Sequence, residues 1–226
     1  MKKVKCKAVI FDLWDTIFSH GFEHEFHPLR LAKDLLVKAG ARKEDVYPTL
    51  FKTLNVMDYG EDKILFSDLC TELGIKLTPK LEKNLKAIWD QGAIQTKLFE
   101  DVEPVLKILK KNFKIGLLSN TSSYKMQYLI DKTKIDSLFN EMLFSFDAGV
   151  AKPDKKAFDL IAKKLQISNT DCVFVGDQLS QDILGAANAG MKPVFLDRAK
   201  KHSIKPKEAV AMINDLRQLL ELIEYG

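Results

Sequence analysis

Six polar residues in this sequence are placed where they could do chemistry together. They are Asp12, Ser119, Asn120, Lys152, Asp177 and Asp182. Each of them ends a short apolar segment or follows one in a loop. Alone, an Asp or Ser at a strand end is commonly a turn or helix cap. Capping does not explain why so many of them occur at the ends of different apolar segments.

The chemistry that these residue types suit is transfer of an anionic group. Clustered carboxylates repel one another and favour a hard divalent cation such as Mg²⁺. The cation would shield Asp12, so that its carboxylate can attack an anionic phosphoryl centre. The Ser119 hydroxyl is suited to hold a phosphoryl oxygen, and Lys152 is suited to neutralise the charge that develops there. We therefore expect a phosphoryl-transfer site where these residues meet.

The six residues can meet only if the apolar segments are strands of one sheet. Five buried strands are predicted, and they cover residues 7–13, 114–119, 142–146, 172–177 and 192–197. None alternates cleanly between polar and apolar residues, which indicates a parallel sheet covered on both faces. Helical patterns separate the last four strands, over residues 122–134, 155–166 and 180–189. We therefore predict a doubly wound, Rossmann-like α/β fold that binds ligands at the carboxyl ends of its strands.

The segment between the first two strands is too long for a simple crossover. Four stretches of helical periodicity occur in it, over residues 29–39, 44–57, 62–73 and 80–90. We interpret residues 18–95 as an all-α cap domain, inserted into a core formed by residues 1–17 and 96–226. A last helix is predicted over residues 207–224.

The composition is that of an ordinary globular protein. Of 226 residues, 46% are apolar and 29% are charged, and the net charge is +4. Lysines are interspersed with acidic residues, whereas a nucleic-acid-binding surface would concentrate them, so no nucleic-acid partner is expected. No window approaches the ~20 apolar residues of a membrane-spanning helix, so no membrane partner is expected either. The three scattered cysteines favour a reducing, cytoplasmic location over a disulfide framework.

Four motifs, in this order, resemble those of the haloacid dehalogenase superfamily of hydrolases. FDLWDT resembles the first motif, Asp-x-Asp-x-Thr, and LLSN resembles the second, an apolar strand that ends in Ser or Thr. AKPD resembles the third motif, which is built on a Lys. VGDQLSQDILGAANAGM resembles the fourth, Gly-Asp followed by another Asp. The resemblance covers essentially the whole predicted core, and the helical insertion resembles the small α-helical cap of this family.

The resemblance implies a role for each matching residue. Asp12 would be the nucleophile that forms an aspartyl-phosphate, and Lys152 would brace the phosphoryl group against it. Ser119, with Asn120 beside it, would bind the phosphoryl group of a small phosphorylated metabolite. The Mg²⁺ ligands would be Asp12, the main-chain carbonyl of Trp14, Asp177 and, directly or as a support, Asp182.

Trp14 departs from the family pattern. Phosphatases of this family normally have an acid two positions after the nucleophile, which protonates the leaving group and later deprotonates the attacking water. A Trp side chain can do neither, although its main-chain carbonyl can still bind a metal. Asp15 is one position further on, where a side chain points in a different direction, so we do not assume that it substitutes. Loss of a general acid and base typically costs ~10²–10⁴ in rate.

Three functions are compatible with this departure. The one we favour is a Mg²⁺-dependent phosphatase whose leaving groups need no proton, such as aryl or acyl phosphates, or which recruits an acid from the cap or the substrate. The second is a 2-haloacid dehalogenase, in which halide leaves without a proton. Family members with that activity lose the metal-binding acids, whereas Asp177 and Asp182 are present here. The third is a weakly active or inactive member that binds a phosphorylated ligand or a protein partner.

Three histidines, His20, His24 and His27, follow the first motif closely. Together with nearby glutamates they are candidate ligands of a transition metal, but their spacing fits no standard zinc module. A polar hinge into the cap is the alternative interpretation. No feature of the sequence indicates an oligomeric state.

The cap is expected to determine the substrate. Its apolar stripes, which include Phe51 and Leu54, are predicted to be core. Long or aromatic side chains that could face the substrate are Met57, Tyr59, Trp89 and Phe99. The sequence does not select among these four residues.

Overall fold

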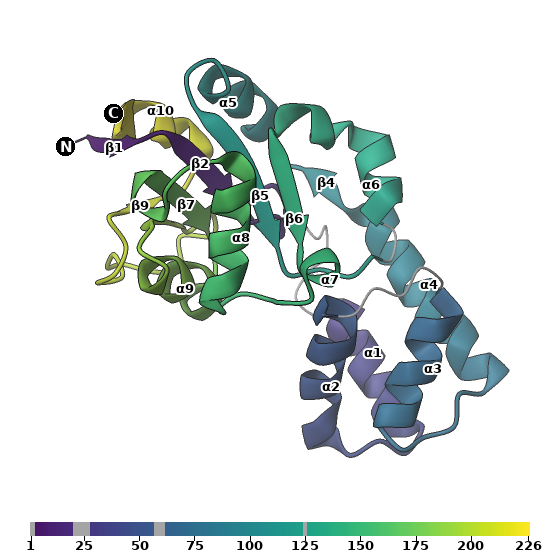
Figure 1. The fold of residues 1–226 in the computed structure, drawn as a ribbon. Coiled ribbons are helices and arrows are strands. Elements are labelled where there is room, and N and C mark those ends of the chain that lie inside the picture. The colour runs from purple at the N-terminus through teal and green to yellow at the C-terminus, as the bar shows by residue number, and fades with distance from the viewer. Residues whose placement is uncertain (1–2, 20–27, 57–61, 124–125) are drawn as a thin grey trace.

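The computed structural model describes residues 3–19, 28–56, 62–123 and 126–226. Its centre is a six-stranded sheet in the order β6-β5-β2-β7-β8-β9 (Figure 1), and all neighbouring strands run parallel. The strands are β2 (Ala8–Phe11), β5 (Lys114–Ser119), β6 (Glu141–Phe144), β7 (Cys172–Gly176), β8 (Lys192–Leu196) and β9 (Ala211–Ile213). All five strands predicted from the sequence are present. β9 adds a further strand at one edge of the sheet.

Helices cover both faces of the sheet, which explains why its strands show no polar alternation. The helices are α5 (Val102–Leu109), α6 (Met126–Thr133), α8 (Lys155–Leu165), α9 (Leu184–Asn188) and α10 (Leu219–Leu222). Val9 and Phe11 of β2 pack into one apolar cluster with α5, α6 and α10. Ala8 and Ile10 point the other way and pack into a second cluster with α8 and α9. The doubly wound α/β fold is therefore confirmed.

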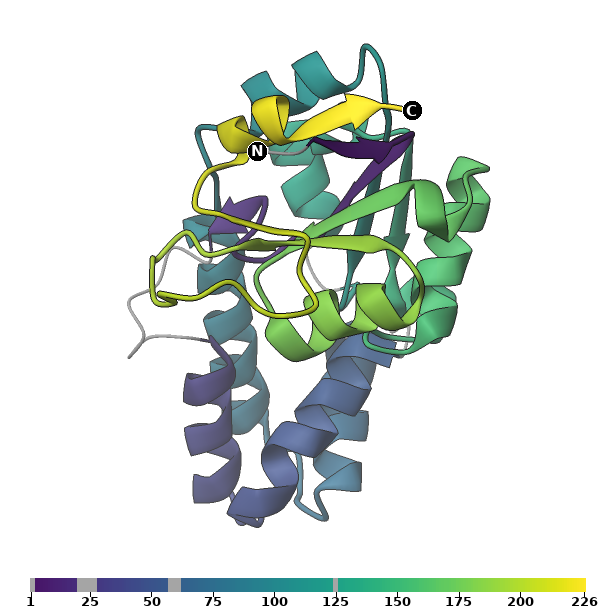
Figure 2. The ribbon, with the colours of Figure 1, turned by 90° about the vertical axis from the view of Figure 1, so that its left-hand side faces the viewer.

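Four helices follow the first strands and form a block of their own, the helical insertion. They are α1 (Pro28–Lys38), α2 (Lys43–Val56), α3 (Asp62–Glu72) and α4 (Pro79–Gln95). Figures 1 and 2 show this insertion below the sheet, and its buried residues, such as Leu36 and Leu69, form a separate apolar cluster. A short antiparallel ribbon of β3 (Phe18–Ser19) and β4 (Lys97–Leu98) connects it to the rest of the chain. The predicted helices are present, and α4 is longer than predicted.

The C-terminal segment differs from the single helix predicted over residues 207–224, so that prediction was wrong. The segment contains β9, a 3-10 turn at Leu216–Gln218, the short helix α10, and β10 (Ile223–Tyr225). β10 pairs in parallel with β1 (Val4–Cys6). The Asp215 side chain accepts a hydrogen bond from the main chain two residues later and caps the turn after β9. β9 pairs with β8, and β10 pairs with β1. This strand pairing outweighs the helical spacing of the apolar residues.

Several sequence features fall outside the described residues. The clustered histidines His20, His24 and His27 belong to this group, and so do Met57 and Tyr59. The three cysteines are all described, and they are buried and free. Within the described ranges, no helix has both the length and the apolar character needed to cross a membrane.

Candidate active site

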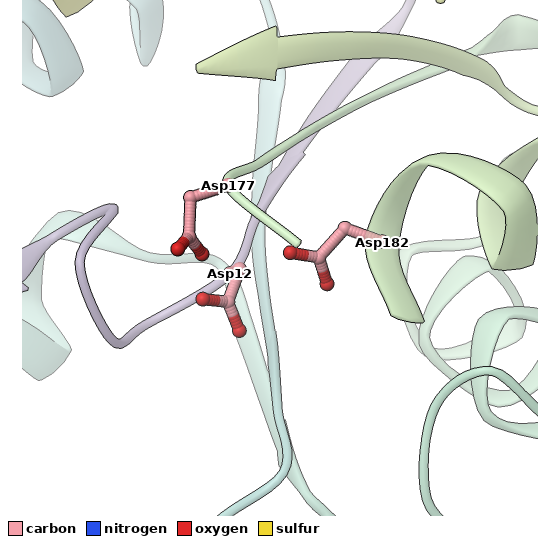
Figure 3. A group of neighbouring side chains, drawn as sticks. All are labelled: Asp12, Asp177 and Asp182. Atoms are coloured by element: carbon pink, nitrogen blue, oxygen red, sulfur yellow. The ribbon is translucent and has the colours of Figure 1, made fainter. Parts of the chain in front are cut away.

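Three carboxylates meet at the carboxyl edge of the sheet. Asp12 directly follows β2, Asp177 directly follows the neighbouring strand β7, and Asp182 lies in a π-helical turn just before α9. One oxygen of each carboxylate lies within 4.8 Å of the others, and Figure 3 shows the three side chains close together. The Asp12 N–H donates to the carbonyl of Val175 at 2.9 Å, so β7 holds the Asp12 main chain. The structure thus brings the three predicted acids together.

Gly176 allows the Asp182 carboxylate to reach this position. A Cβ atom at residue 176 would overlap that carboxylate. Asp182 is completely buried, and its Oδ2 accepts a hydrogen bond of 3.0 Å from the Gln178 N–H. The segment from Gly176 to Asp182 therefore ends strand β7, forms a helical turn, and brings the Asp182 carboxylate close to the main chain of Gly176.

Lys152 bridges two of the carboxylates. Its Nζ donates to Asp12 Oδ1 at 2.5 Å and to Asp182 Oδ1 at 2.7 Å. Only 2% of the Lys152 surface is exposed, and its ammonium lies 5.5 Å from the centre of the Phe174 ring. Three ionised carboxylates would therefore face one ammonium group within a largely buried site.

Asn120 holds the main chain of Lys152. Its Nδ2 donates to the carbonyl of Lys152 at 2.9 Å, and its Oδ1 accepts from the Lys152 N–H at 2.8 Å. Its Nδ2 also donates to Gln181 Oε1 at 3.0 Å. Asn120, predicted to bind substrate, thus contacts the lysine that bridges the carboxylates.

Ser119 ends β5 and is completely buried. Its hydroxyl has no hydrogen-bond partner among the residues that the structure describes. The neighbouring Thr121 and Ser122 line the cavity described below. These two residues were not predicted from the sequence, although their position directly after a strand end was a usable signal.

Burial and mutual repulsion govern the protonation of the acids. Burial, and then the neighbouring carboxylates, raise the pKa of Asp177 to about 8. Burial also raises the pKa of Asp12 to about 7, although the Lys152 ammonium opposes this shift. Burial alone would lower the pKa of Lys152, but its two carboxylate partners outweigh burial and raise it. The cluster therefore tends to hold a proton near neutral pH, and a bound cation would displace that proton.

These residues fit a hard divalent cation. Asp177 Oδ1 is buried and has no hydrogen-bond partner in the described part of the chain. The side-chain donors of the cluster are carboxylate oxygens, which Mg²⁺ prefers. A cation would also compensate the negative charge that Lys152 leaves unbalanced. Trp14, whose main-chain carbonyl is a predicted ligand, lies in the loop directly after Asp12.

A cavity of about 710 Å³ lies between this edge of the sheet and the helical insertion. Its lining includes Asp12 and Lys152 from the core and residues of α1, α2 and α4 from the insertion. Phe51 of α2 was predicted to be core, but 40% of it is exposed and it lines the cavity. The prediction was wrong because Leu50 and Leu54 already fill the apolar cluster of the insertion. α2 itself packs against α7 (Ser145–Ala148) of the core.

Both tryptophans of the chain, Trp14 and Trp89, line the cavity. Trp89 is thus one of the predicted substrate-facing residues that the structure places there. The indole of Trp14 also packs against Phe18, with the ring centres 6.3 Å apart. Phe99, another predicted candidate, is not part of the cavity lining. Its ring instead lies 3.9 Å below the guanidinium of Arg198.

Arg198 is a half-buried support of the first motif that was not predicted from the sequence. Its guanidinium donates two hydrogen bonds to the carboxylate of Asp101, at 2.9 and 3.0 Å, and one to the carbonyl of Thr16 at 2.8 Å. Asp101 is itself 2% exposed and accepts a further bond from the Leu216 N–H. The signal that could have identified Arg198 is its place just beyond the end of β8.

Comparison with known proteins agrees with this site. A family model described as haloacid dehalogenase-like hydrolase matches residues 6–190. A glyceraldehyde 3-phosphate phosphatase of Methanopyrus kandleri is 31% identical over 206 residues, covering 89% of this chain and 88% of that protein. The pyrimidine 5′-nucleotidase YjjG of Escherichia coli is 34% identical over 122 residues, which cover 51% of this chain and 53% of YjjG.

Solved structures share the fold. A HAD phosphatase from Thermococcus onnurineus matches with a TM-score of 0.67 and 20% identity, covering 95% of this chain and 96% of that one. A 2-haloacid dehalogenase from Pseudomonas syringae matches with a TM-score of 0.66 and 22% identity, covering 96% and 97%. With a family model matching most of its length and an acid cluster at the carboxyl edge of the sheet, the chain belongs to the haloacid dehalogenase-like hydrolases.

Proposed function

We propose that this hydrolase is a Mg²⁺-dependent phosphatase, which acts on a small phosphorylated substrate through an aspartyl-phosphate on Asp12. The contacts of Lys152 support the proposal best, because one buried ammonium holds both Asp12 and Asp182. Asp177 adds a buried oxygen that has no partner among the described residues. The site thus has a nucleophile, a fixed positive charge and an unsatisfied ligand atom for a cation. The phosphatase relative that is 31% identical agrees with this chemistry.

In the proposed first step, an Asp12 oxygen forms a bond to phosphorus while the bond from phosphorus to the leaving oxygen breaks. The leaving oxygen keeps the electron pair, and water then hydrolyses the aspartyl-phosphate to inorganic phosphate and a free Asp12 carboxylate. Lys152 stays protonated and offsets the negative charge on the phosphoryl oxygens. Asn120 keeps Lys152 in place. In this proposal the Ser119 hydroxyl donates a hydrogen bond to a phosphoryl oxygen.

Asp12, the main-chain carbonyl of Trp14, Asp177 and Asp182 would hold the Mg²⁺ ion. When bound, the ion shields the Asp12 carboxylate and polarises the phosphoryl oxygens. In this proposal residues 1–17 and 96–226 form the catalytic core and residues 18–95 form the cap. We place the reaction in the cytoplasm, because the three cysteines are free.

Trp14 restricts which leaving groups can depart. No acid stands two positions after the nucleophile, so a basic alkoxide would have to leave without a proton from that position. Aryl and acyl oxygens carry the negative charge more easily and leave without such help. We therefore expect aryl and acyl phosphates to be turned over faster than alkyl phosphates.

Dehalogenation of a 2-haloacid has less support. Such a substrate carries a carboxylate, which needs a cationic partner in the cavity. Among the described residues that line the cavity, Lys152 is the only cation, and it already pairs with Asp12 and Asp182. A dehalogenase also needs no metal, whereas the three carboxylates form a group that could hold one.

The test is release of inorganic phosphate from p-nitrophenyl phosphate and acetyl phosphate, measured with Mg²⁺ and with EDTA. We expect turnover that needs Mg²⁺ and that Asp12→Asn abolishes, because the amide is a poor nucleophile. Asp136→Asn, which changes an exposed Asp of a 3-10 helix, is the control and should leave turnover unchanged. Chloride release from 2-chloropropionate without metal would favour a dehalogenase, and tight binding of Mg²⁺ and vanadate without any turnover would favour a binding protein.

A further inference from the structure

The cavity is chemically divided between its two walls. Its charged lining residues, among those described, are Asp12, Asp15, Lys152 and Asp177, and all four belong to the core. The wall formed by the helical insertion has no charged side chain in its described part. It consists mainly of apolar and aromatic residues, of which Leu29, Tyr47, Phe51 and Trp89 are the largest exposed or half-buried ones.

The apolar wall is available for a ligand. Leu29, Tyr47 and Phe51 are 36%, 46% and 40% exposed, although helices α1 and α2 bury their other faces in the cluster of the insertion. Large apolar side chains that are gathered in one concave site and left exposed are typical of a binding surface. Covering them with an apolar group stabilises the complex in proportion to the area removed from water.

Among the described lining residues, the one cation of the core wall is already paired with carboxylates. Lys152 pairs with Asp12 and Asp182, so it serves the phosphoryl end of the cavity. A leaving group with a second phosphate, a carboxylate or many hydroxyls would find no described partner of opposite charge on the insertion wall. Burying such a group without a partner costs free energy.

We infer that the phosphatase proposed above, on which this inference rests, acts on monoesters of apolar, ring-bearing alcohols, with phenols as the preferred class. The phosphoryl group lies against Asp12 and Lys152, and the ring packs against Trp14, Phe51 and Trp89. When the bond from phosphorus to oxygen breaks, the phenolic oxygen keeps the electron pair and takes its proton from water. A phenolate needs no acid at position 14, so the apolar wall and the missing acid select the same leaving group.

This specificity would differ from that of the similar archaeal phosphatase. Glyceraldehyde 3-phosphate, the substrate in the printed name of the Methanopyrus protein, is small and polar. It would leave most of a cavity of about 710 Å³ unfilled. We expect phenyl phosphate to have the higher kcat/KM of the two.

Binding of phosphonates tests the inference without turnover. Their carbon–phosphorus bond is not hydrolysed, and the only two tryptophans of the chain, Trp14 and Trp89, both line the cavity. Tryptophan fluorescence, checked by calorimetry, should show that benzylphosphonate binds about tenfold more tightly than methylphosphonate in the presence of Mg²⁺. Equal affinities, or tighter binding of methylphosphonate, would overturn the inference.

Three single-residue variants test whether the apolar wall causes this preference. Phe51→Ser should remove most of the preference for benzylphosphonate over methylphosphonate. Ile64→Ser changes a side chain of α3 that is 50% exposed and does not line the cavity, so the preference should persist. A preference that survives in Phe51→Ser and Tyr47→Ser would place the ring elsewhere and overturn the assignment.

Kinetics separate this inference from the proposed function. Phenyl phosphate and biphenyl-4-yl phosphate release phenols of nearly equal acidity, so a higher kcat/KM for the larger ester reports on the wall alone. If both esters and glyceraldehyde 3-phosphate are hydrolysed without preference, the phosphatase proposal stands and the inference fails. If benzylphosphonate binds selectively but no ester is hydrolysed, the phosphatase proposal fails, and the apolar wall still selects the ligand.

Discussion

The side chain of Asn120 makes two hydrogen bonds with the main chain of Lys152, at 2.9 and 2.8 Å. One amide thereby fixes the segment from which the Lys152 ammonium reaches Asp12 and Asp182. A small shift of that ammonium would weaken its contact with Asp12, the proposed nucleophile. Asn120 is therefore a positioning residue, whether or not it also contacts substrate.

Asn120→Ala should lower kcat by about 10²-fold, with a smaller effect on KM, because misplacing a catalytic group by about 1 Å can cost that much. The measurement is steady-state kinetics with p-nitrophenyl phosphate. Asn140→Ala is the matched control, because Asn140 Oδ1 also accepts a main-chain N–H, that of Ile115, but at the opposite end of β5. An equal loss of kcat in the two variants would contradict the positioning role.

Trp14→Asp should raise turnover of alkyl phosphates, because it restores an acid two positions after the nucleophile. The expected gain is up to about 10²-fold for an alkyl phosphate and much less for p-nitrophenyl phosphate. Trp14→Asn removes the same indole without adding an acid, so it controls for the lost packing against Phe18. A gain shared by both variants, or no gain in a folded Trp14→Asp protein, would refute the account of the missing acid.

The raised pKa values predict how stability depends on pH. Burial raises the pKa of Asp177 from 3.8 to about 8, so between these values the folded state binds a proton that the unfolded state has released. Stability of the metal-free protein should therefore fall as pH rises through this window. The proposed Mg²⁺ ion would bind the ionised carboxylates, so Mg²⁺ should raise Tm more at pH 8 than at pH 5.

Asp177→Asn tests the assignment of this effect. In EDTA at pH 8 the variant should have the higher Tm, because the amide carries no charge into the buried cluster. It should also lose most of the Mg²⁺-induced rise in Tm. Thermal unfolding of both proteins from pH 5 to pH 9, with EDTA and with Mg²⁺, measures both effects. A Mg²⁺ effect that is independent of pH in the unmodified protein would contradict the prediction.

Gly176→Ala should destabilise the protein by about 1–3 kcal/mol and reduce turnover, because its Cβ would overlap the Asp182 carboxylate. Urea unfolding gives the change in the free energy of unfolding. The same substitution in an Asp182→Gly background should cost much less, because the overlapping atoms are side-chain atoms of Asp182, its Cβ included. If the two costs are equal, something other than Asp182 opposes a side chain at position 176.

Much of the site could be predicted because its residues occupy strand ends. The strands before Asp12 and Asp177 are buried on both faces, so they appear in the sequence as unbroken apolar runs. Their parallel pairing then forces the two acids to the same edge. Lys152 comes after β6, and Asp182, like Asp177, comes after β7, so the same rule predicts that both lie at this edge.

Other features could not be predicted from local patterns. The spacing of Ile213, Leu216 and Ile223 suits a helix, but strand pairing at two separate places decides the structure there. Phe51 has the spacing of a core residue, and only the tertiary structure shows that the cluster of the insertion is full without it. Arg198 and Asp101 lie far apart in sequence, so no local sequence pattern predicts their ion pair.

Arg198 ties both ends of the β3–β4 ribbon to the core. It holds Thr16 on the outgoing side and Asp101 on the returning side, whereas the insertion beyond the ribbon touches the core through α2 and α7. If the helical insertion swings to admit a substrate, Arg198 confines the pivot to the part of the chain beyond these two anchors. Asp12 would keep its place in the core during such a swing, and only the wall that we propose to hold the leaving group would move.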